Sequence, residues 1–279
     1  MNRKLLREAR LWLIAIPIAL WTLIPIYHIF LFSISTKDSA FSGKLWPDHP
    51  TLRNFGTVFR EEHFYLHHFW NQIWNSLWIA LAVGTITLAV STCAAFAISR
   101  LKVRGGRGVM NAALFTYFIP AAFLAVPMYK AMGAYGLLNS RWSLVLAMVT
   151  LASPYAIWVL KQASDKLPWE LDEAARIDGA TPLQLFRLVY LPLMLPSLVA
   201  IGTYAVLLAW NEYLYAFLLL SHENTIPLAV GLGHFLAADD SPWELLMATA
   251  LVYALPPAAI YYAFRRYMVG GLTAGAVKS

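Results

Sequence analysis

The side chains in this sequence that are able to do chemistry do not form a catalytic set. His63 and His67 are four residues apart, and on a helix this spacing would let both imidazoles bind one metal ion. No ordered carboxylate partner is evident beside them, and the neighbouring aromatic residues favour a helix at a membrane surface. Cys93 is the only cysteine, which excludes an internal disulfide or a cysteine-based metal site within the chain. We therefore expect no catalytic residue, no metal and no cofactor.

The sequence also lacks the phosphate-binding loop of ATPases. That loop has the pattern Gly-x-x-x-x-Gly-Lys-Ser/Thr, because glycine backbone N–H groups and the lysine surround the phosphate oxygens. No stretch of the chain has this pattern. We expect that the chain is not an enzyme and that any energy from ATP comes from another subunit.

The composition indicates that the helices carrying these residues lie in a membrane. Of the 279 residues, 59% are hydrophobic and 13% are charged, about half the charged fraction of an ordinary soluble domain. Apolar runs of about 20 residues, enough to cross a hydrocarbon core of about 30 Å, recur along the chain. We predict an all-α polytopic membrane protein with six transmembrane helices, in a single domain over residues 1–279. The expected spans lie near residues 11–32, 73–98, 109–129, 142–160, 193–220 and 245–264.

Four prolines interrupt two of these spans: Pro120 and Pro127 in the third, and Pro256 and Pro257 in the sixth. Proline kinks a membrane helix or leaves carbonyl groups free to line a cavity. Irregular packing without a function is the alternative.

Lysine and arginine predict the orientation, because these residues are retained on the cytoplasmic side. The richer set of alternate loops contains Arg3, Lys4, Arg7, Arg10, Arg100, Lys102, Arg104, Arg107, Lys161, Lys166, Arg176, Arg187, Arg265, Arg266 and Lys278. The poorer set contains Lys37, Lys44, Arg53, Arg60, Lys130 and Arg141. Both termini should then be cytoplasmic, and the first apolar run, too long for a signal peptide, should be an uncleaved span. Orientation explains the net charge of +6 better than nucleic acid does, since no continuous basic face is present.

The expected cytoplasmic loop of residues 163–192 has the signals of two short helices. Pro168 suits a first helical turn, and Gly179 can adopt the left-handed conformation that ends a helix. Thr181 and Pro182 can then open a second helix that runs through Tyr190.

The first of these helices has an apolar face that is too small to stabilise it alone in water. We expect this face to dock against a partner, although a helix resting on its own protein or on lipid headgroups is the alternative. The face consists of Leu171, Ala174, Ala175 and Ile177.

This loop resembles the signature of the inner-membrane permease family of binding-protein-dependent ATP-binding-cassette importers. The family pattern is Glu-Ala-Ala, three residues, Gly, nine residues, Ile, one residue, Leu-Pro. The chain keeps this spacing and departs from it only at Val189, which replaces Ile. The matching residues are Glu173, Ala174, Ala175, Gly179, Leu191 and Pro192.

The resemblance extends over nearly the whole chain and is closest to the smaller, six-span subunit of the maltose-type carbohydrate permeases. Its other segments are Asn75 with Ser76, residues 94–97 with Arg100, and residues 136–139, 210–212 and 271–278. It implies a subunit that forms half of the pore of a sugar importer in a bacterial-type inner (plasma) membrane.

The resemblance also implies partners: a second permease subunit in a heterodimer, two ATPase subunits or domains, an extracytoplasmic sugar-binding protein and the lipid bilayer, with no nucleic acid. The loop helix would be the coupling helix held by the ATPase. The tail from Gly270 to Ser279 would contact the ATPase pair, with a disordered tail as the alternative. Because the binding protein selects the cargo, sugars, polyols, glycerol phosphate and modified sugars all remain open.

We expect the solute path beside Asn211 and Glu212 in the fifth span, with Tyr215 one helical turn from Asn211. A charge deep in lipid costs about 2.5–3.5 kcal/mol, so Glu212 should face protein or water. On a continuous helix from Leu193, Glu212 would lie roughly 28 Å along the axis, where snorkelling to the interface is the alternative.

An ATP-independent secondary transporter and a membrane enzyme are the alternative functions. A secondary transporter usually needs ionisable groups within its spans, and here only Glu212 qualifies. The acidic residues lie almost all in loops, which argues against an enzyme in the membrane.

Overall fold

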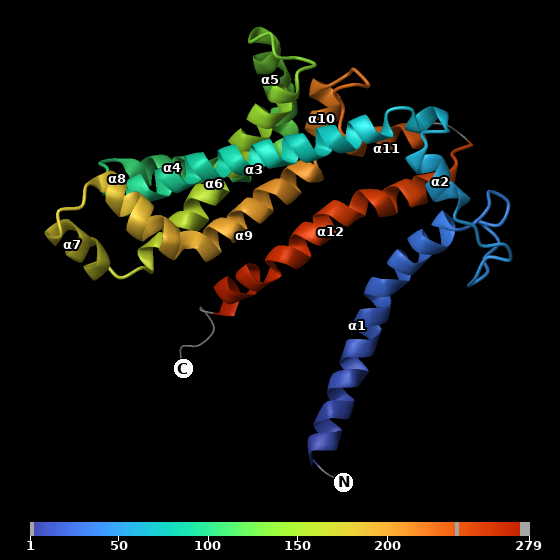
Figure 1. Cartoon of the computed structure of the whole chain (residues 1–279), viewed down its shortest axis with the longest axis horizontal. Coiled ribbons are helices and arrows are strands. Elements are labelled where there is room, and N and C mark those ends of the chain that lie inside the picture. Colours follow the sequence, from blue (N-terminus) through green and yellow to red (C-terminus); the bar gives the residue numbers. More distant parts are fainter. Residues whose placement is uncertain (1–2, 238–239, 274–279) are drawn as a thin grey trace. The chain divides into compact units, whose positions relative to one another are not determined.

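The computed structural model describes residues 3–237 and 240–273, and these form only helices and connecting loops (Figure 1). The chain divides into two units, Met1–Trp70 with Gly231–Leu255 and Asn71–Val230 with Pro256–Ser279. In chain order the elements are α1 (Arg3–Ser33), α2 (Arg53–Phe59), η1 (Phe64–Leu66), α3 (Phe69–Ser99), α4 (Gly106–Phe115), η2 (Thr116–Phe118), α5 (Ala121–Ala134), α6 (Arg141–Asp165), α7 (Glu170–Ile177), α8 (Pro182–Gln184), the π-helical η3 (Leu185–Tyr190), α9 (Leu191–Trp210), α10 (Leu214–Leu219), α11 (Leu228–Phe235) and α12 (Trp243–Thr273).

The described helices include five that are long and apolar enough to cross a membrane, and a bent pair would make a sixth span. The five lie in α1, α3, α6, α9 and α12, and the pair joins α4 and η2 to α5. The predicted all-α polytopic fold class is thereby confirmed.

The third expected span is broken. Its two parts, Gly106–Phe118 and Ala121–Ala134, are bent by 108°. Ile119 is extended, with φ −89° and ψ 118°, because the ring of the following Pro120 disfavours helical backbone and proline has no N–H to continue the helix. Pro127 stays inside α5. The expectation of one continuous helix over residues 109–129 is therefore wrong.

In the first unit, α2 holds the end of α1. The Nδ2 atom of buried Asn54 donates hydrogen bonds to the carbonyl oxygens of Ser33 and Ser35 at 2.9 and 2.8 Å. These bonds satisfy acceptors near the end of the helix. His63 precedes η1, where its Nδ1 accepts a hydrogen bond from Tyr65 N at 3.4 Å. Since η1 ends at Leu66, His63 and His67 do not have the helical spacing that a shared metal would need.

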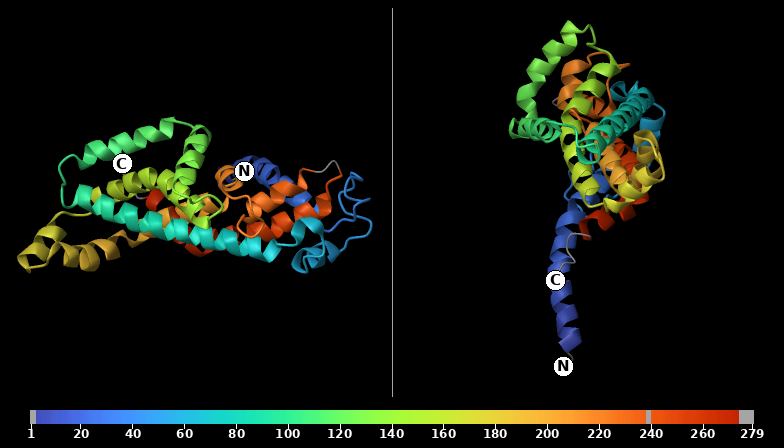
Figure 2. Two further views of the ribbon diagram at one scale, coloured as in Figure 1. Left: turned by 90° about the horizontal axis from the view of Figure 1, so that it is seen from above. Right: turned by 90° about the vertical axis from the view of Figure 1, so that its left-hand side faces the viewer.

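In the second unit, α3 and α9 approach each other closely at two glycines. A Cβ atom on Gly84 would lie 2.5 Å from Val206 Cγ2, and one on Gly202 would lie 2.8 Å from Leu88 Cδ1. Helix α9 also packs against α6. Figure 2 shows α7, in yellow, at one end of this unit. The core cluster behind α7 consists of Ala95, Phe96, Ala156, Leu160, Leu185, Tyr190, Met194 and Ile201.

Candidate functional site

Helix α7 begins and ends near the helix signals in its sequence. Its first turn contains Glu170, Asp172 and Glu173, whose carboxylates are favourable beside the positive end of a helix. Gly179 has a φ of +78°, and glycine adopts this left-handed conformation without steric cost, so the helix ends before it. The predicted helix and turn are confirmed, although Pro168 precedes the helix instead of opening it.

A capping box starts the second helix of the loop. Thr181 Oγ1 accepts a hydrogen bond from Gln184 N at 3.3 Å, and Gln184 Oε1 accepts one from Thr181 N at 2.8 Å. Helix α8, η3 and α9 follow without a gap, so the second helix continues past Tyr190 into the next span. Leu191 is half-buried against the core cluster, and Pro192 is exposed in the first turn of α9.

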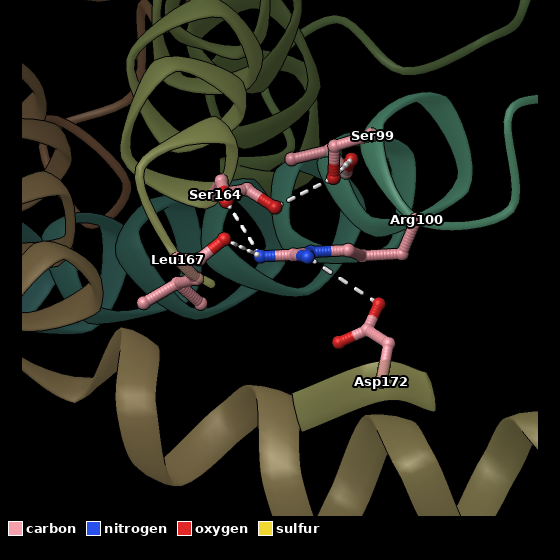
Figure 3. Close-up of polar contacts among 6 residues, drawn as sticks. Ser99, Arg100, Ser164, Leu167 and Asp172 are labelled. Atoms are coloured by element: carbon pink, nitrogen blue, oxygen red, sulfur yellow. Dashed lines mark hydrogen bonds and ion pairs between the residues drawn. The ribbon is translucent and has the colours of Figure 1, made fainter. Parts of the chain in front are cut away.

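A buried ion pair attaches α7 to the rest of the second unit. Arg100 Nη1 lies 3.4 Å from Asp172 Oδ2, and only 4% and 7% of the two side chains are exposed. Arg100 Nη2 also donates to the carbonyl oxygens of Ser164 at 2.7 Å and Leu167 at 3.1 Å. Figure 3 shows the guanidinium between these carbonyls and the carboxylate. Beside it, the hydroxyls of Ser99 and Ser164 share a hydrogen bond of 2.6 Å.

The Trp169 ring, directly before α7, has three cationic side chains around it. Lys102 Nζ lies 4.3 Å from the ring centroid, and the Cζ atoms of Arg100 and Arg176 lie 5.6 and 5.7 Å from it. Cations within about 6 Å of an aromatic centroid are attracted by the ring quadrupole. Trp169 therefore adds a second contact between the end of α3 and α7.

Sequence reasoning missed this attachment. From the sequence, Arg100 is one of several positive loop residues, and Asp172 only complements the end of a helix. One signal was present, because Arg100 directly follows an apolar run, where a cation must reach solvent or a partner. The sequence could not name the partner, since Asp172 lies 72 positions away.

The apolar residues of α7 divide between two faces, contrary to the expected single face. Ala175 is half-buried against the core cluster, on the same side as Asp172, three residues earlier. Leu171 and Ile177 are 41% and 85% exposed, and Ala174 is exposed with them. We call these three residues the outer face of α7. Glu173, next to the outer face, is also exposed.

The expected solute-path residues lie where α9 gives way to α10. Helix α9 ends at Trp210, so the expected continuous span over residues 193–220 is wrong, and Asn211 and Tyr215 do not share one helix. Asn211 is exposed, and its Nδ2 donates to Leu207 O at 2.8 Å. Glu212 Oε1 accepts a hydrogen bond from Tyr215 N at 2.8 Å, which caps the start of α10.

Tyr215 is buried and has a packing contact. It is 2% exposed, and its hydroxyl donates to Ala121 O at 2.7 Å. That oxygen belongs to the first residue of α5, directly after the break at Pro120. Tyr215 thus joins two interruptions in the helices, between α4 and α5 and between α9 and α10.

A sequence model of the family described as binding-protein-dependent transport system inner membrane component matches residues 90–273. The chain belongs to this family. It is 32% identical to a trehalose transport system permease protein of Mycobacterium tuberculosis, with 98% of each chain covered. It is 31% identical to a maltose/maltodextrin transport system permease protein of Vibrio parahaemolyticus, with 96% of each covered. A crystal structure of a bacterial ABC transporter involved in the import of the acidic polysaccharide alginate matches with a TM-score of 0.80 and 26% identity, over 96% of this chain and 98% of that one.

This permease is therefore a multi-pass inner-membrane component of a binding-protein-dependent ABC importer. It is not an enzyme, because ATP hydrolysis in such importers belongs to a separate subunit. The resemblance inferred from the α7 loop is confirmed. Of the expected tail, the first residues continue α12 to Thr273, and residues 274–279 lie outside the described part of the chain.

Proposed function

We propose that this permease forms one half of the pore of an importer for a sugar or sugar-like solute. A second permease subunit would form the other half in a heterodimer, two ATPase subunits or domains would supply energy, and an extracytoplasmic sugar-binding protein would deliver the solute. Residues 1–279 would act as one permease domain, with both termini and α7 on the cytoplasmic side. The sugar class is supported by the relatives for trehalose and for maltose or maltodextrin, and by the fold shared with the alginate importer.

The observation that carries this proposal is the free outer face of α7 on a helix whose inner face is anchored. Asp172 and Ala175 hold the inner side against the second unit. The outer face is left exposed in that unit, although exposed apolar side chains on a short helix are unfavourable in water. A groove in an ATPase subunit would bury them.

Each residue of the signature has a place in this coupling role. Glu173 and Ala174 would contact the ATPase, because both are exposed beside the rest of the outer face. Gly179 permits the turn at positive φ. The remaining signature residues, Ala175, Leu191 and Pro192, would connect the loop to the core cluster and to the first turn of α9. Residues 270–279 would add a second ATPase contact, which truncation after Gly270 tests through ATP-dependent uptake.

A Gly179→Asp variant tests the coupling role. The new side chain strains the left-handed turn and adds a charge beside the outer face, so the ATPase should no longer co-purify and ATP-driven uptake should be lost. Gly105→Asp is the matched control, because Gly105 has a φ of +79° and, like Gly179, would have no atom within 4 Å of a new Cβ. Normal co-purification and uptake by Gly179→Asp would rule out the coupling role.

The solute path would run beside Asn211 and Glu212. The exposed amide of Asn211 is suited to hydrogen bonds with hydroxyl groups, while Glu212 and Tyr215 would shape the interruption that presents it. Asn211→Ala should slow uptake while leaving assembly unchanged, and Tyr215→Phe should act through the lost bond to Ala121 O. Parental uptake rates for trehalose, maltose and other sugars in both variants would place the path elsewhere.

A further inference from the structure

Arg100 joins three elements that meet at one end of the second unit. It directly follows α3. Its guanidinium binds the carbonyls of Ser164 in the last turn of α6 and Leu167 just beyond it, and pairs with Asp172 in the first turn of α7. One side chain therefore holds both ends of the connection from α6 to α7 and fixes it to α3 (Figure 3).

Because the Arg100 charge is buried, the attachment of α7 cannot be broken without a large cost in free energy. A buried cation is tolerated only when an opposite charge and hydrogen-bond acceptors surround it. Here Asp172 supplies the charge, and the end of α6 supplies carbonyls at the negative end of its helix dipole. Separating α7 from α3 would leave the Arg100 charge without its counter-ion, and separating α6 from α3 would remove its carbonyl acceptors, so these elements are held in one arrangement.

The contact at Trp169 joins the same elements a second time. Lys102, from the segment after α3, lies over the ring at 4.3 Å, and Arg176 within α7 lies at 5.7 Å. The other end of α7 also has contacts, because Ala175 packs against the core cluster and α7 lies against η3. A displacement of α7 would therefore reach α3 and α6 through Arg100 and Trp169, and η3 through these apolar contacts.

We propose that Arg100 and Asp172 are a positioning pair that makes α7 move as one body with the ends of α3 and α6. The proposal rests on the proposed function, because it takes α7 as the ATPase contact. A push on the outer face then displaces two spans through the ion pair, and α9 through the chain connection. Both side chains are buried within the permease, so the contribution we propose for them is to transmit movement.

Distances between two spin labels test whether α7 and α3 move together. Val103→Cys and Glu170→Cys are introduced with Cys93→Ser, because Val103 and Glu170 are exposed. Glu170 lies on the same side of α7 as Ala174 and Ile177, so the labelled permease must still co-purify with the ATPase. Val103 N donates to Ala97 O at 3.3 Å, so this label follows the end of α3. In the assembled transporter, the distance distribution should be narrow and unchanged between the nucleotide-free and ATP-bound states.

Asp172→Asn should break this rigid link while keeping the shape of the side chain. The label distance should broaden and shift on ATP binding, and ATP hydrolysis stimulated by the binding protein should fall about tenfold, within the 5–150-fold range of coupling between sites. Asp165→Asn is the matched control, because it breaks the Lys161–Asp165 pair, whose 2.5 Å contact lies within α6 alone. The control should keep parental distances and stimulation.

Arg100→Lys is a second variant that keeps the positive charge but loses the forked geometry, and it should shift the distance in the same direction. A label distance that stays fixed in both variants overturns the proposal. Failure of both variants to accumulate, while Asp165→Asn accumulates, also overturns it, because the pair then serves stability alone. Failure of the proposed function would appear separately, as an ATPase that still co-purifies with Gly179→Asp.

Discussion

The two ends of α3 both hold a neighbouring loop, but they do so with different chemistry. At one end, Arg100 holds the α7 connection through a buried charge. At the opposite end, Asn75 Nδ2 donates to the carbonyl oxygens of Asn224 and Ile226, both at 2.9 Å. Ser76 Oγ accepts a hydrogen bond from Leu228 N there, also at 2.9 Å. The first loop is held by a buried ion pair. The second is held by hydrogen bonds from neutral side chains of α3, one of which runs from Gln72 Nε2 to the Glu223 carboxylate at 3.2 Å.

The difference lies in what remains when one partner is lost. Removing one member of the ion pair leaves a buried charge without compensation, whereas removing an amide leaves neutral groups that lack a hydrogen bond. The attachment of α7 therefore fails as a unit, and the attachment at Asn75 weakens in smaller steps. An all-or-none link would suit the transmission of movement proposed for α7.

The largest effect is expected when the charged attachment is broken. Arg100→Met leaves Asp172 buried without a counter-ion and removes two hydrogen bonds, so the free energy of unfolding should fall by about 3–5 kcal/mol. Thermal unfolding of the purified permease in detergent measures this change. Lys161→Met is the control, because its partner Asp165 is 40% exposed and can be solvated. A loss below about 1 kcal/mol for Arg100→Met would contradict the contrast between the two ends.

The neutral attachment should give a smaller effect. Asn75→Ala leaves the buried carbonyl of Ile226 and the part-buried carbonyl of Asn224 without this donor, which should lower the free energy of unfolding by about 1–3 kcal/mol. The same unfolding measurement applies, with Asn71→Ala as the control, because Asn71 is exposed and makes only one bond to Asn75. Equal losses for Asn75→Ala and Arg100→Met would show that charge makes no difference.

Local sequence signals predicted four of the six spans and the helices of the α7 loop well. The acidic first turn, the glycine at positive φ and the Thr181 cap all act within a few residues, and each lies where the sequence placed it. The same reasoning failed where the outcome depends on distant partners. Sequence reasoning could not predict that Arg100 pairs with Asp172. It also could not predict that Tyr215 is buried and donates its hydroxyl to Ala121 O.

The broken spans show a second limit of the sequence. Pro120 indicated a disturbance, but the size of the bend, 108°, depends on how α4 and α5 pack. Nothing within residues 210–214 demands that α9 end at Trp210, since no proline or glycine is present. Glu212 accepts a hydrogen bond from Tyr215 N at the start of α10. An acidic side chain therefore begins a new helix where the apolar composition favoured one continuous helix.

The middle of α3 should give the smallest effect, because it is held by close packing without charge or hydrogen bonds. Gly84→Ala places a Cβ 2.5 Å from Val206 Cγ2, which the β-branched valine relieves by leaving its preferred rotamer. We expect a loss of about 1 kcal/mol in the free energy of unfolding, at the low end for an overpacked contact. Adding Val206→Ala should restore most of this loss. Gly56→Ala in α2 is the control, because its new Cβ meets no atom within 4 Å, so it should be neutral or stabilising. If the double variant is no more stable than Gly84→Ala, the α3–α9 contact does not depend on the space at Gly84, and packing does not distinguish the middle of α3 from its ends.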